Sequence, residues 1–241
     1  MKRFSILLAA LLMGTGSLLA QSHQWFTRHI LSDKHAMMSV NTQKRYILLP
    51  IEEKENETTI KVIKDSHSMQ DIKVRLATGK PDYFVPLDIS KFGKDGKVLL
   101  DFSFQGNYRT VGNIEDYSCW QLMKESDTFD TTNREAYRPV YHHTPLWGWM
   151  NDPNGMFYKD GVWNLYYQYN PYGSTWENMT WGHATSRDLV HWQYEGTPIE
   201  PDDLGTIFSG SAVVDSSNTA GFGKNAIVAM YTTAAENQTQ S

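Results

Sequence analysis

Residues 156–169, MFYKDGVWNLYYQY, decide the fold class because they read as two β-strands joined by a tight turn. Asp160-Gly161 supplies the positive φ angles that a two-residue hairpin turn requires. Further runs rich in strand-forming residues follow at 180–186, 209–215 and 226–232. Short antiparallel strands at this spacing predict a barrel, a sandwich or a propeller.

The sequence upstream of this hairpin also predicts strands and shows no sustained helical period. Residues 45–51 form an apolar run, and residues 58–64 are rich in β-branched side chains. Val98, Leu100, Phe102 and Phe104 fall on one face of a third strand. We therefore predict an all-β protein with a β-sandwich over residues 25–125, a linker over 126–137 and a second β domain over 138–241.

The N-terminus, MKRFSILLAALLMGTGSLLA, has the pattern of a secretory signal peptide over residues 1–20. Its basic start precedes a short apolar run and then small residues, and cleavage after Ala20 is the expected processing. A transmembrane anchor is the alternative, and the shortness of the apolar run disfavours it. We expect an exported protein, periplasmic or extracellular, with no membrane span after cleavage of the signal.

Composition limits the classes of partner. The net charge is −5 and no long basic run occurs, so we expect no nucleic-acid partner. Cys119 is the only cysteine, so no internal disulfide can form, and we expect it to be a small packed side chain. The histidines lack the spacing of a metal site, and we predict no metal ligand and no cofactor. The sequence does not indicate an oligomeric state.

The stretch GWMNDPNG, residues 148–155, places a tight polar turn directly after large apolar side chains. It permits two interpretations. It can be a plain surface turn leaving a buried strand, or it can hold the carboxylate of Asp152 at the rim of an aromatic pocket. Neighbouring amides can donate to an ionised carboxylate, and an oriented carboxylate can act as a nucleophile.

The next sixty residues favour the second interpretation. Each of three segments places a flat or polar side chain near a strand end: LYYQYNP with Gln168, WENMTWGHA with Trp176, and TIFSGSAV with Phe208 and Ser209. Aromatic faces suit the apolar faces of a sugar ring, and Gln, Asn and Ser can bond its hydroxyls. A carboxylate, aromatic platforms and neutral polar groups together describe a carbohydrate site.

Four segments in this order and spacing resemble glycoside hydrolase family 32, the invertases, inulinases and levanases. They are GWMNDPNG, LYYQYNP, WENMTWGHATSRDLVHW and FSGSAV, and the resemblance covers residues 138–241. It implies the first blades of a five-bladed β-propeller and cleavage of β-fructofuranosides with retention. Residues 25–125 are similar, more weakly, to a Bacteroides-type N-terminal β domain found before this catalytic domain.

The resemblance also implies roles for individual residues. Asp152 corresponds to the nucleophile, and the fructose subsite would be lined by Asn151, Gln168, Trp176, Phe208 and Ser209, with Trp149 helping to wall it. Retaining hydrolysis needs a second carboxyl group as general acid and base, and no metal.

Two pieces of the family pattern are missing. No Arg-Asp-Pro motif follows Ser211, and no Glu-Cys-Pro-like motif supplies the acid/base Glu. Asp188 reads as a turn residue, and Glu177, Glu195, Glu200 and Glu236 match no acid/base motif. Since a blade takes roughly 40–50 residues, the residues after the linker suffice for about two blades. We expect a truncated chain that is itself inactive.

Three functions fit these motifs: a retaining β-fructosidase acting on fructans or sucrose, a non-catalytic fructan-binding propeller protein, and a related hydrolase of furanosides such as arabinans. The Trp-Met-Asn-Asp-Pro-Asn-Gly run favours fructosyl specificity over the arabinan branch, and a carboxylate at Asp152 favours an enzyme over a binding protein. The motifs do not distinguish β-2,6 from β-2,1 linkages, or exo from endo attack.

Overall fold

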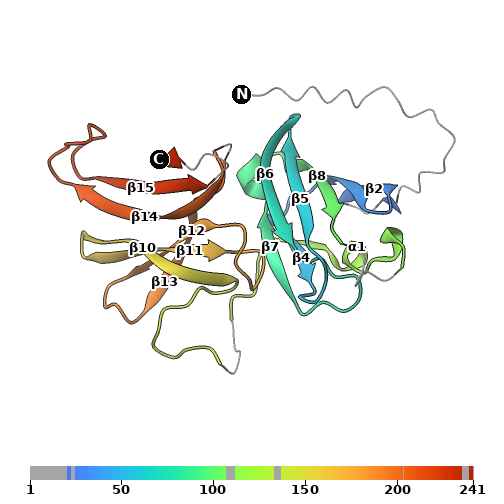
Figure 1. Ribbon diagram of the computed structural model, residues 1–241, viewed down its shortest axis with the longest axis horizontal. Helices are drawn as coiled ribbons and strands as arrows, with labels where there is room; N and C mark the ends of the chain where they lie inside the picture. Colours follow the sequence, from blue (N-terminus) through green and yellow to red (C-terminus); the bar gives the residue numbers. More distant parts are fainter. Residues whose placement is uncertain are drawn as a thin grey trace. The chain divides into compact units, whose positions relative to one another are not determined.

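The computed structural model describes residues 21–22, 25–106, 112–132, 137–202, 204–234 and 239–240. The chain divides into two compact units, Met1–Phe129 and Asp130–Ser241, and strands dominate both of them (Figure 1). The all-β prediction is therefore confirmed. The predicted signal peptide, residues 1–20, lies outside the described residues. Within the described part, no helix is both long enough and apolar enough to cross a membrane.

The first unit contains two antiparallel sheets. The larger has the strand order β1 (Gln21–Ser22), β2 (Phe26–Ser32), β3 (His35–Asn41), β8 (Lys97–Phe104), β5 (Thr58–Lys64) and β6 (His67–Val74). The smaller has the order β7 (Tyr83–Asp88), β4 (Tyr46–Ile51) and β9 (Lys124–Ser126). The 3₁₀ helices η1 (Ile89–Phe92) and η2 (Ile114–Asp116) and the short helix α1 (Cys119–Leu122) complete this unit.

Alternation along β8 builds the core of this unit. Its four predicted inward residues, Val98, Leu100, Phe102 and Phe104, are all buried. Trp120 of α1 packs edge-on against Phe102, with ring centroids 5.2 Å apart, and α1 also contacts β4 of the smaller sheet. The short helix thus links the two sheets of the predicted β-sandwich. Cys119 is completely buried, as predicted, and burial raises the pKa of its thiol well above the ordinary range.

Residues expected in the linker take part in the smaller sheet. Ser126 pairs with Tyr46 in the β4–β9 ladder. Asp127 accepts hydrogen bonds from Lys44 Nζ at 2.6 Å and from the backbone N–H of Arg45 at 3.3 Å. The ordered part of the first unit therefore extends at least to Asp127, and the linker and domain boundaries remain predictions.

The second unit contains two further antiparallel sheets. The first is a meander of β10 (Trp149–Lys159), β11 (Val162–Asn170), β12 (Thr180–Ser186) and β13 (Trp192–Ile199). The second comprises β14 (Thr206–Asp215), β15 (Ala226–Ala234) and β16 (Thr239–Gln240). The predicted hairpin is confirmed: Lys159 pairs with Val162, and Asp160 and Gly161 have φ angles of 53° and 81°. A four-stranded meander is the unit from which propeller blades are built.

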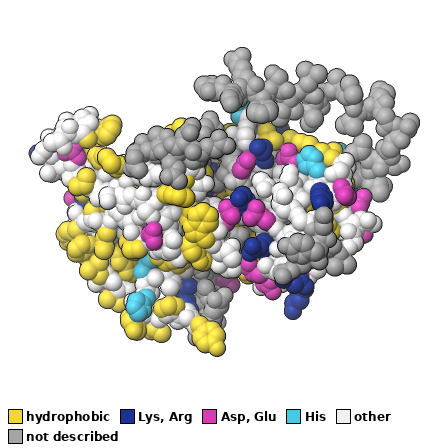
Figure 2. Space-filling model, viewed as in Figure 1, with side chains coloured by type: hydrophobic (Ala, Val, Ile, Leu, Met, Phe, Trp, Pro, Cys, Tyr) yellow, Lys and Arg dark blue, Asp and Glu magenta, His cyan; other side chains and the backbone are white. Residues whose placement is uncertain are grey.

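The two faces of the meander pack differently. On one face, Leu165, Tyr167, Tyr169 and Ala184 form a buried cluster, against which Met150, Trp192 and Tyr194 pack. The other face lies toward β14, since Trp181 of β12 donates from its indole Nε1 to the carbonyl of Phe208 at 3.0 Å. In the second sheet, Val213 and Met230 leave more than half of their side chains exposed. Figure 2 shows hydrophobic side chains gathered over this unit.

Candidate carbohydrate site

A β-bulge displays the predicted nucleophile. Met150 pairs with Tyr169 and Pro153 pairs with Tyr167, so Asn151 and Asp152 together face a single residue of β11, Gln168. A bulge of this kind bends the strand and redirects its side chains. Asn151 and Asp152 are accordingly exposed, whereas Gln168 is only 3% exposed. The turn-prone Asp-Pro-Asn-Gly residues thus lie inside the strand β10, so the first of the two interpretations, a plain surface turn leaving a buried strand, is wrong.

A second bulge displays the next pair of predicted site residues. In β14, Ile207 pairs with Thr233 and Gly210 with Tyr231, so Phe208 and Ser209 together face Thr232 alone. Ser209 Oγ donates a hydrogen bond of 2.8 Å to Oδ2 of Asp152. The two bulges therefore bring together residues that lie 57 positions apart in the sequence.

Small residues allow β14 to lie close to both β10 and β15 beside this hydrogen bond. Gly155 has a φ angle of +44°, and a Cβ atom there would lie 2.8 Å from the Cβ of Ala212. At Gly210 a Cβ atom would lie 2.0 Å from the carbonyl oxygen of Met230. Neither position can hold a larger residue without movement of the backbone. The glycine of the Asp-Pro-Asn-Gly motif therefore sets the distance between β10 and β14, and the glycine of the Phe-Ser-Gly motif sets the distance between β14 and its partner strand β15.

Two aromatic side chains lie together at the site. The rings of Trp176 and Phe208 are 6.2 Å apart between centroids and packed edge to face. Trp176 is 53% exposed, so its ring is available to a ligand. The loop that carries Trp176 is held by buried Asn170, which donates from Nδ2 to the carbonyl of Thr175 at 2.9 Å and accepts from the N–H of Tyr172 at 2.9 Å.

Within the described ranges, the remaining predicted site residues, Trp149, Asn151 and Gln168, form no hydrogen bond with the side chain of Asp152. Trp149 is half-buried on β10 and pairs with Asn170, and Asn151 occupies the bulge beside Asp152. In the described part of the chain, no ring contact joins Trp149 to Trp176 or Phe208. Gln168 has a buried Nε2 without a hydrogen-bond partner among the described residues. A buried amide N–H group without a protein partner can donate a hydrogen bond to a hydroxyl group of a ligand.

Other polar residues singled out in the sequence have local partners. Asp188 accepts hydrogen bonds from the His191 ring and from the backbone N–H groups of His191 and Val190, and these bonds hold its pKa well below the usual range. This confirms it as a turn residue. Glu195 accepts from Thr185 at 2.7 Å, and Glu200 accepts from Thr197. His183 stacks on Tyr166 with ring centroids 4.3 Å apart, and burial lowers its pKa.

Two residues of the site region were not predicted. Asn170 orders the Trp176 loop, and Asn154 accepts a hydrogen bond from the N–H of Gly210 at 3.4 Å through its Oδ1. Both side chains are almost fully buried. The signal available in the sequence was a polar amide inside or at the end of a strand rich in apolar residues, where an uncharged polar side chain needs a specific partner.

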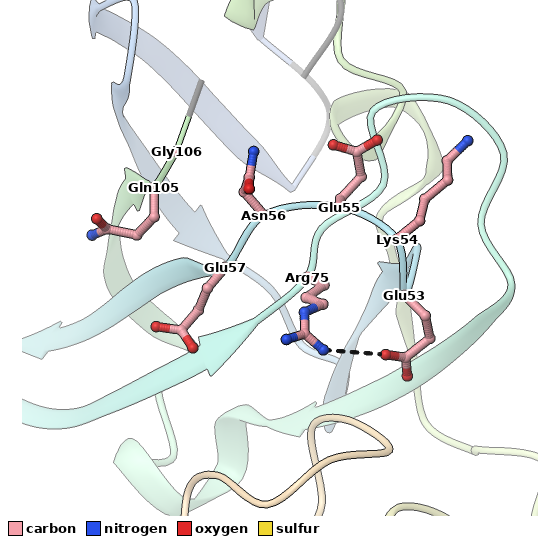
Figure 3. A pocket seen from close by; sticks show the side chains of 8 residues that line it. All are labelled: Glu53, Lys54, Glu55, Asn56, Glu57, Arg75, Gln105 and Gly106. Atoms are coloured by element: carbon pink, nitrogen blue, oxygen red, sulfur yellow. Dashed lines mark ion pairs between the residues drawn. The ribbon is translucent and has the colours of Figure 1, made fainter. Parts of the chain in front are cut away.

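A separate hollow of about 470 Å³ lies in the first unit, near the loop between β4 and β5. Its lining is mainly charged, and Arg75 and Glu53 form an ion pair of 3.6 Å within it (Figure 3). The lining residues are Glu53, Lys54, Glu55, Asn56, Glu57, Arg75, Gln105 and Gly106. It contains none of the predicted site residues, and Asp152 lies instead on an open surface of the second unit.

Comparisons with known proteins divide the chain at residue 141. Residues 32–141 match a domain of unknown function, DUF4980, and residues 142–241 match the glycosyl hydrolases family 32 N-terminal domain. A levanase of Bacillus subtilis is 58% identical over 101 residues, which cover 41% of this chain and 15% of the levanase. An invertase of Wickerhamomyces anomalus is 53% identical over 131 residues, covering 49% of this chain and 24% of the invertase.

Among solved structures, a β-fructofuranosidase of Schwanniomyces occidentalis complexed with fructosyl-erythritol is 49% identical to the matched segment. Its TM-score is 0.41, and the match covers 43% of this chain and 22% of that one. The chain thus spans less than a quarter of these relatives. The family match falls on the segment that contains both bulges, Gln168 and the Trp176 loop. Residues 142–241 therefore match the N-terminal domain of glycosyl hydrolase family 32, as the sequence resemblance predicted.

Proposed function

We propose that the protein that carries these 241 residues is a retaining glycoside hydrolase that cleaves β-fructofuranosidic bonds in fructans such as levan or inulin, and in sucrose. The observation that carries this proposal is the exposed carboxylate of Asp152, hydrogen-bonded by Ser209 at 2.8 Å on the bulge opposite Gln168. Relatives named levanase and invertase share this segment at more than 50% identity, which supports the choice of substrate.

The proposed chemistry begins with Asp152. The Ser209 hydrogen bond occupies Oδ2 and leaves Oδ1 to form a bond with the anomeric carbon of the fructosyl unit. The bond from that carbon to the departing oxygen breaks as a second carboxyl group protonates this oxygen. Water, deprotonated by the same carboxylate, then cleaves the ester to Asp152 and releases fructose.

The surrounding side chains bind the sugar in this proposal. Trp176 and Phe208 present aromatic surface to the apolar parts of the ring. Gln168 offers its buried Nε2 and Asn151 its exposed amide as hydrogen-bond partners for hydroxyl groups. Trp149, which lies on the same strand as Asp152, forms one side of the sugar-binding site in this proposal. All these groups are neutral, which suits an uncharged saccharide.

The acid/base carboxyl group is not assigned to any described residue. Glu195 and Glu200 are engaged by threonine hydroxyls, and the backbone N–H groups of Thr219 and Ala220 bind Asp215. We therefore propose that residues outside this chain supply the acid/base and that residues 1–241 alone release no fructose. Export directed by the predicted signal peptide is also proposed, and a mature N-terminus at Gln21 would support it.

The test compares the full-length protein, its Asp152→Asn variant and the polypeptide 1–241 on levan, inulin and sucrose. Fructose release by the wild type should fall by at least about 10³-fold in Asp152→Asn, a loss typical of removing a nucleophile, while levan binding persists. Undiminished turnover by Asp152→Asn would overturn the proposal. A full-length protein that binds levan and releases no fructose would instead be a fructan-binding protein.

A further inference from the structure

Asn154 is a buried amide whose side chain connects the two strands of the site. It is 3% exposed, and its Oδ1 accepts a hydrogen bond of 3.4 Å from the backbone N–H of Gly210. Gly210 directly follows Ser209, the residue that donates to Asp152. Asn154 therefore bonds the backbone at the end of the second bulge, one residue from the hydroxyl that bonds the carboxylate.

Three contacts between β10 and β14 run in parallel. Asp152 bonds Ser209, Asn154 bonds Gly210, and Gly155 lies directly against Ala212. The middle contact is the one made from a side chain to the backbone. It lies where the chain leaves the bulge, next to the residue whose Oγ bonds Oδ2 of Asp152.

An amide at this position is costly for stability alone. The Nδ2 of Asn154 is buried and has no hydrogen-bond partner among the described residues. A buried donor left without a partner costs about 1–3 kcal/mol. An apolar side chain of similar size would avoid that penalty, so keeping an amide here indicates a role besides packing.

We propose that Asn154 is a positioning residue for hydrolysis, which rests on the function proposed above. By holding the N–H of Gly210, it keeps Ser209 Oγ on Oδ2 of Asp152 and the carboxylate turned for attack through Oδ1. Asn154 itself touches no reacting atom. Its loss lowers the rate of the chemical step because small displacements of a reacting group are costly.

A double-mutant cycle in the full-length protein tests this assignment. Asn154→Ala should lower kcat for fructose release about ten- to a hundredfold and change KM much less. Ser209→Ala should lower kcat as well. Because both changes break the same arrangement, the double variant should lose little more than the worse single variant. Losses that simply multiply would show that Asn154 does not act through Ser209.

The matched control is Asn218, another asparagine whose Oδ1 accepts from a glycine N–H, that of Gly223 at 2.7 Å. It lies in the turn between β14 and β15, so Asn218→Ala should leave kcat unchanged and add no coupling to Ser209→Ala. If Asn154→Ala fails to fold, Asn154→Ser should show the same kcat loss, because its shorter side chain keeps a polar group but cannot reach Gly210.

Failure of this inference is distinct from failure of the proposed function. A wild type that releases fructose, an inactive Asp152→Asn variant and an Asn154→Ala variant with unchanged kcat would overturn only the assignment of Asn154. A wild type that releases no fructose would overturn both.

Discussion

At the scale of single residues, the environment of Asp152 depends on glycines nearby, whose missing side chains allow the strands to pack closely. Gly155 leaves room for β10 to approach β14, and Gly210 leaves room for β14 to pair closely with β15, on either side of the hydrogen bond from Ser209 to the carboxylate. Gly210 has no positive φ angle, so steric crowding alone excludes a side chain there: a Cβ atom would lie 2.0 Å from Met230 O and 2.7 Å from Tyr231 Cα. Both of these are backbone atoms and cannot move aside independently.

Gly210→Ala should therefore impair stability and hydrolysis together. Overpacking of this kind costs about 1–3 kcal/mol of unfolding free energy, and the displaced strand carries Ser209 away from Asp152. Denaturant unfolding followed by tryptophan fluorescence, with kcat measured on the same samples, would show both effects. Gly79→Ala is the control, because Gly79 also lacks a positive φ angle and its Cβ would meet only the carboxylate oxygens of Glu52 at an ordinary 3.7 Å. Equal behaviour of the two variants would contradict the steric argument.

At the scale of the strands, local patterns predicted eight of the sixteen strands in the described residues but not their irregularities. Asp160-Gly161 predicted the hairpin, and β-branched and aromatic runs predicted β12, β14 and β15. Strand β13 was missed because Gly196 and Pro198 interrupt its pattern. The bulges at Asn151-Asp152 and Phe208-Ser209 could not be predicted, since a bulge depends on the register with the partner strand. The motifs predicted candidate site residues, whereas the Asp152–Ser209 hydrogen bond depends on how the two sheets pack.

The packing of the meander also predicts how stability depends on pH. Burial lowers the pKa of His143, which lies against Tyr167 and Trp192, and of His183, which stacks on Tyr166. The folded state thus favours the neutral rings, while the unfolded chain takes up protons as pH falls below about 6.5. The contribution of these two rings to the free energy of unfolding is therefore fully present above that pH and is lost as the pH falls.

A double variant, His143→Phe with His183→Gln, should flatten the dependence of Tm on pH between 7.5 and 5.5. Thermal unfolding at a series of pH values measures this slope. His142→Gln provides the control, because His142 is the exposed neighbour of His143 and its replacement should retain the wild-type slope. A double variant that still loses Tm as steeply on acidification would show that other groups control the pH response.

At the scale of the whole molecule, the chain consists of two units that build separate cores. In the first unit, Trp120 packs between the two sheets. In the second unit, the buried side chains of β11 and β12, among them Tyr167 and Tyr169, form the core. The smaller sheet of the first unit ends at Ser126, and the first strand of the second unit begins at Trp149. Between them, Tyr137 is 98% exposed and Tyr141 is 76% exposed. Exposed segments between compact units are preferred sites of proteolysis.

Chymotrypsin should therefore make its first cuts after Tyr137 and Tyr141 under native conditions. The strand tyrosines Tyr167 and Tyr169 are completely buried, so cleavage there requires unfolding of the meander. Mass spectrometry of the early products should show an N-terminal fragment ending near residue 137 or 141. Replacing both tyrosines by alanine should slow this cut and leave Phe222, 77% exposed in the β14–β15 turn, as the main remaining site. First cuts within β2–β8 would mean that the first unit is not an independently stable body, and the predicted linker would then have to be abandoned.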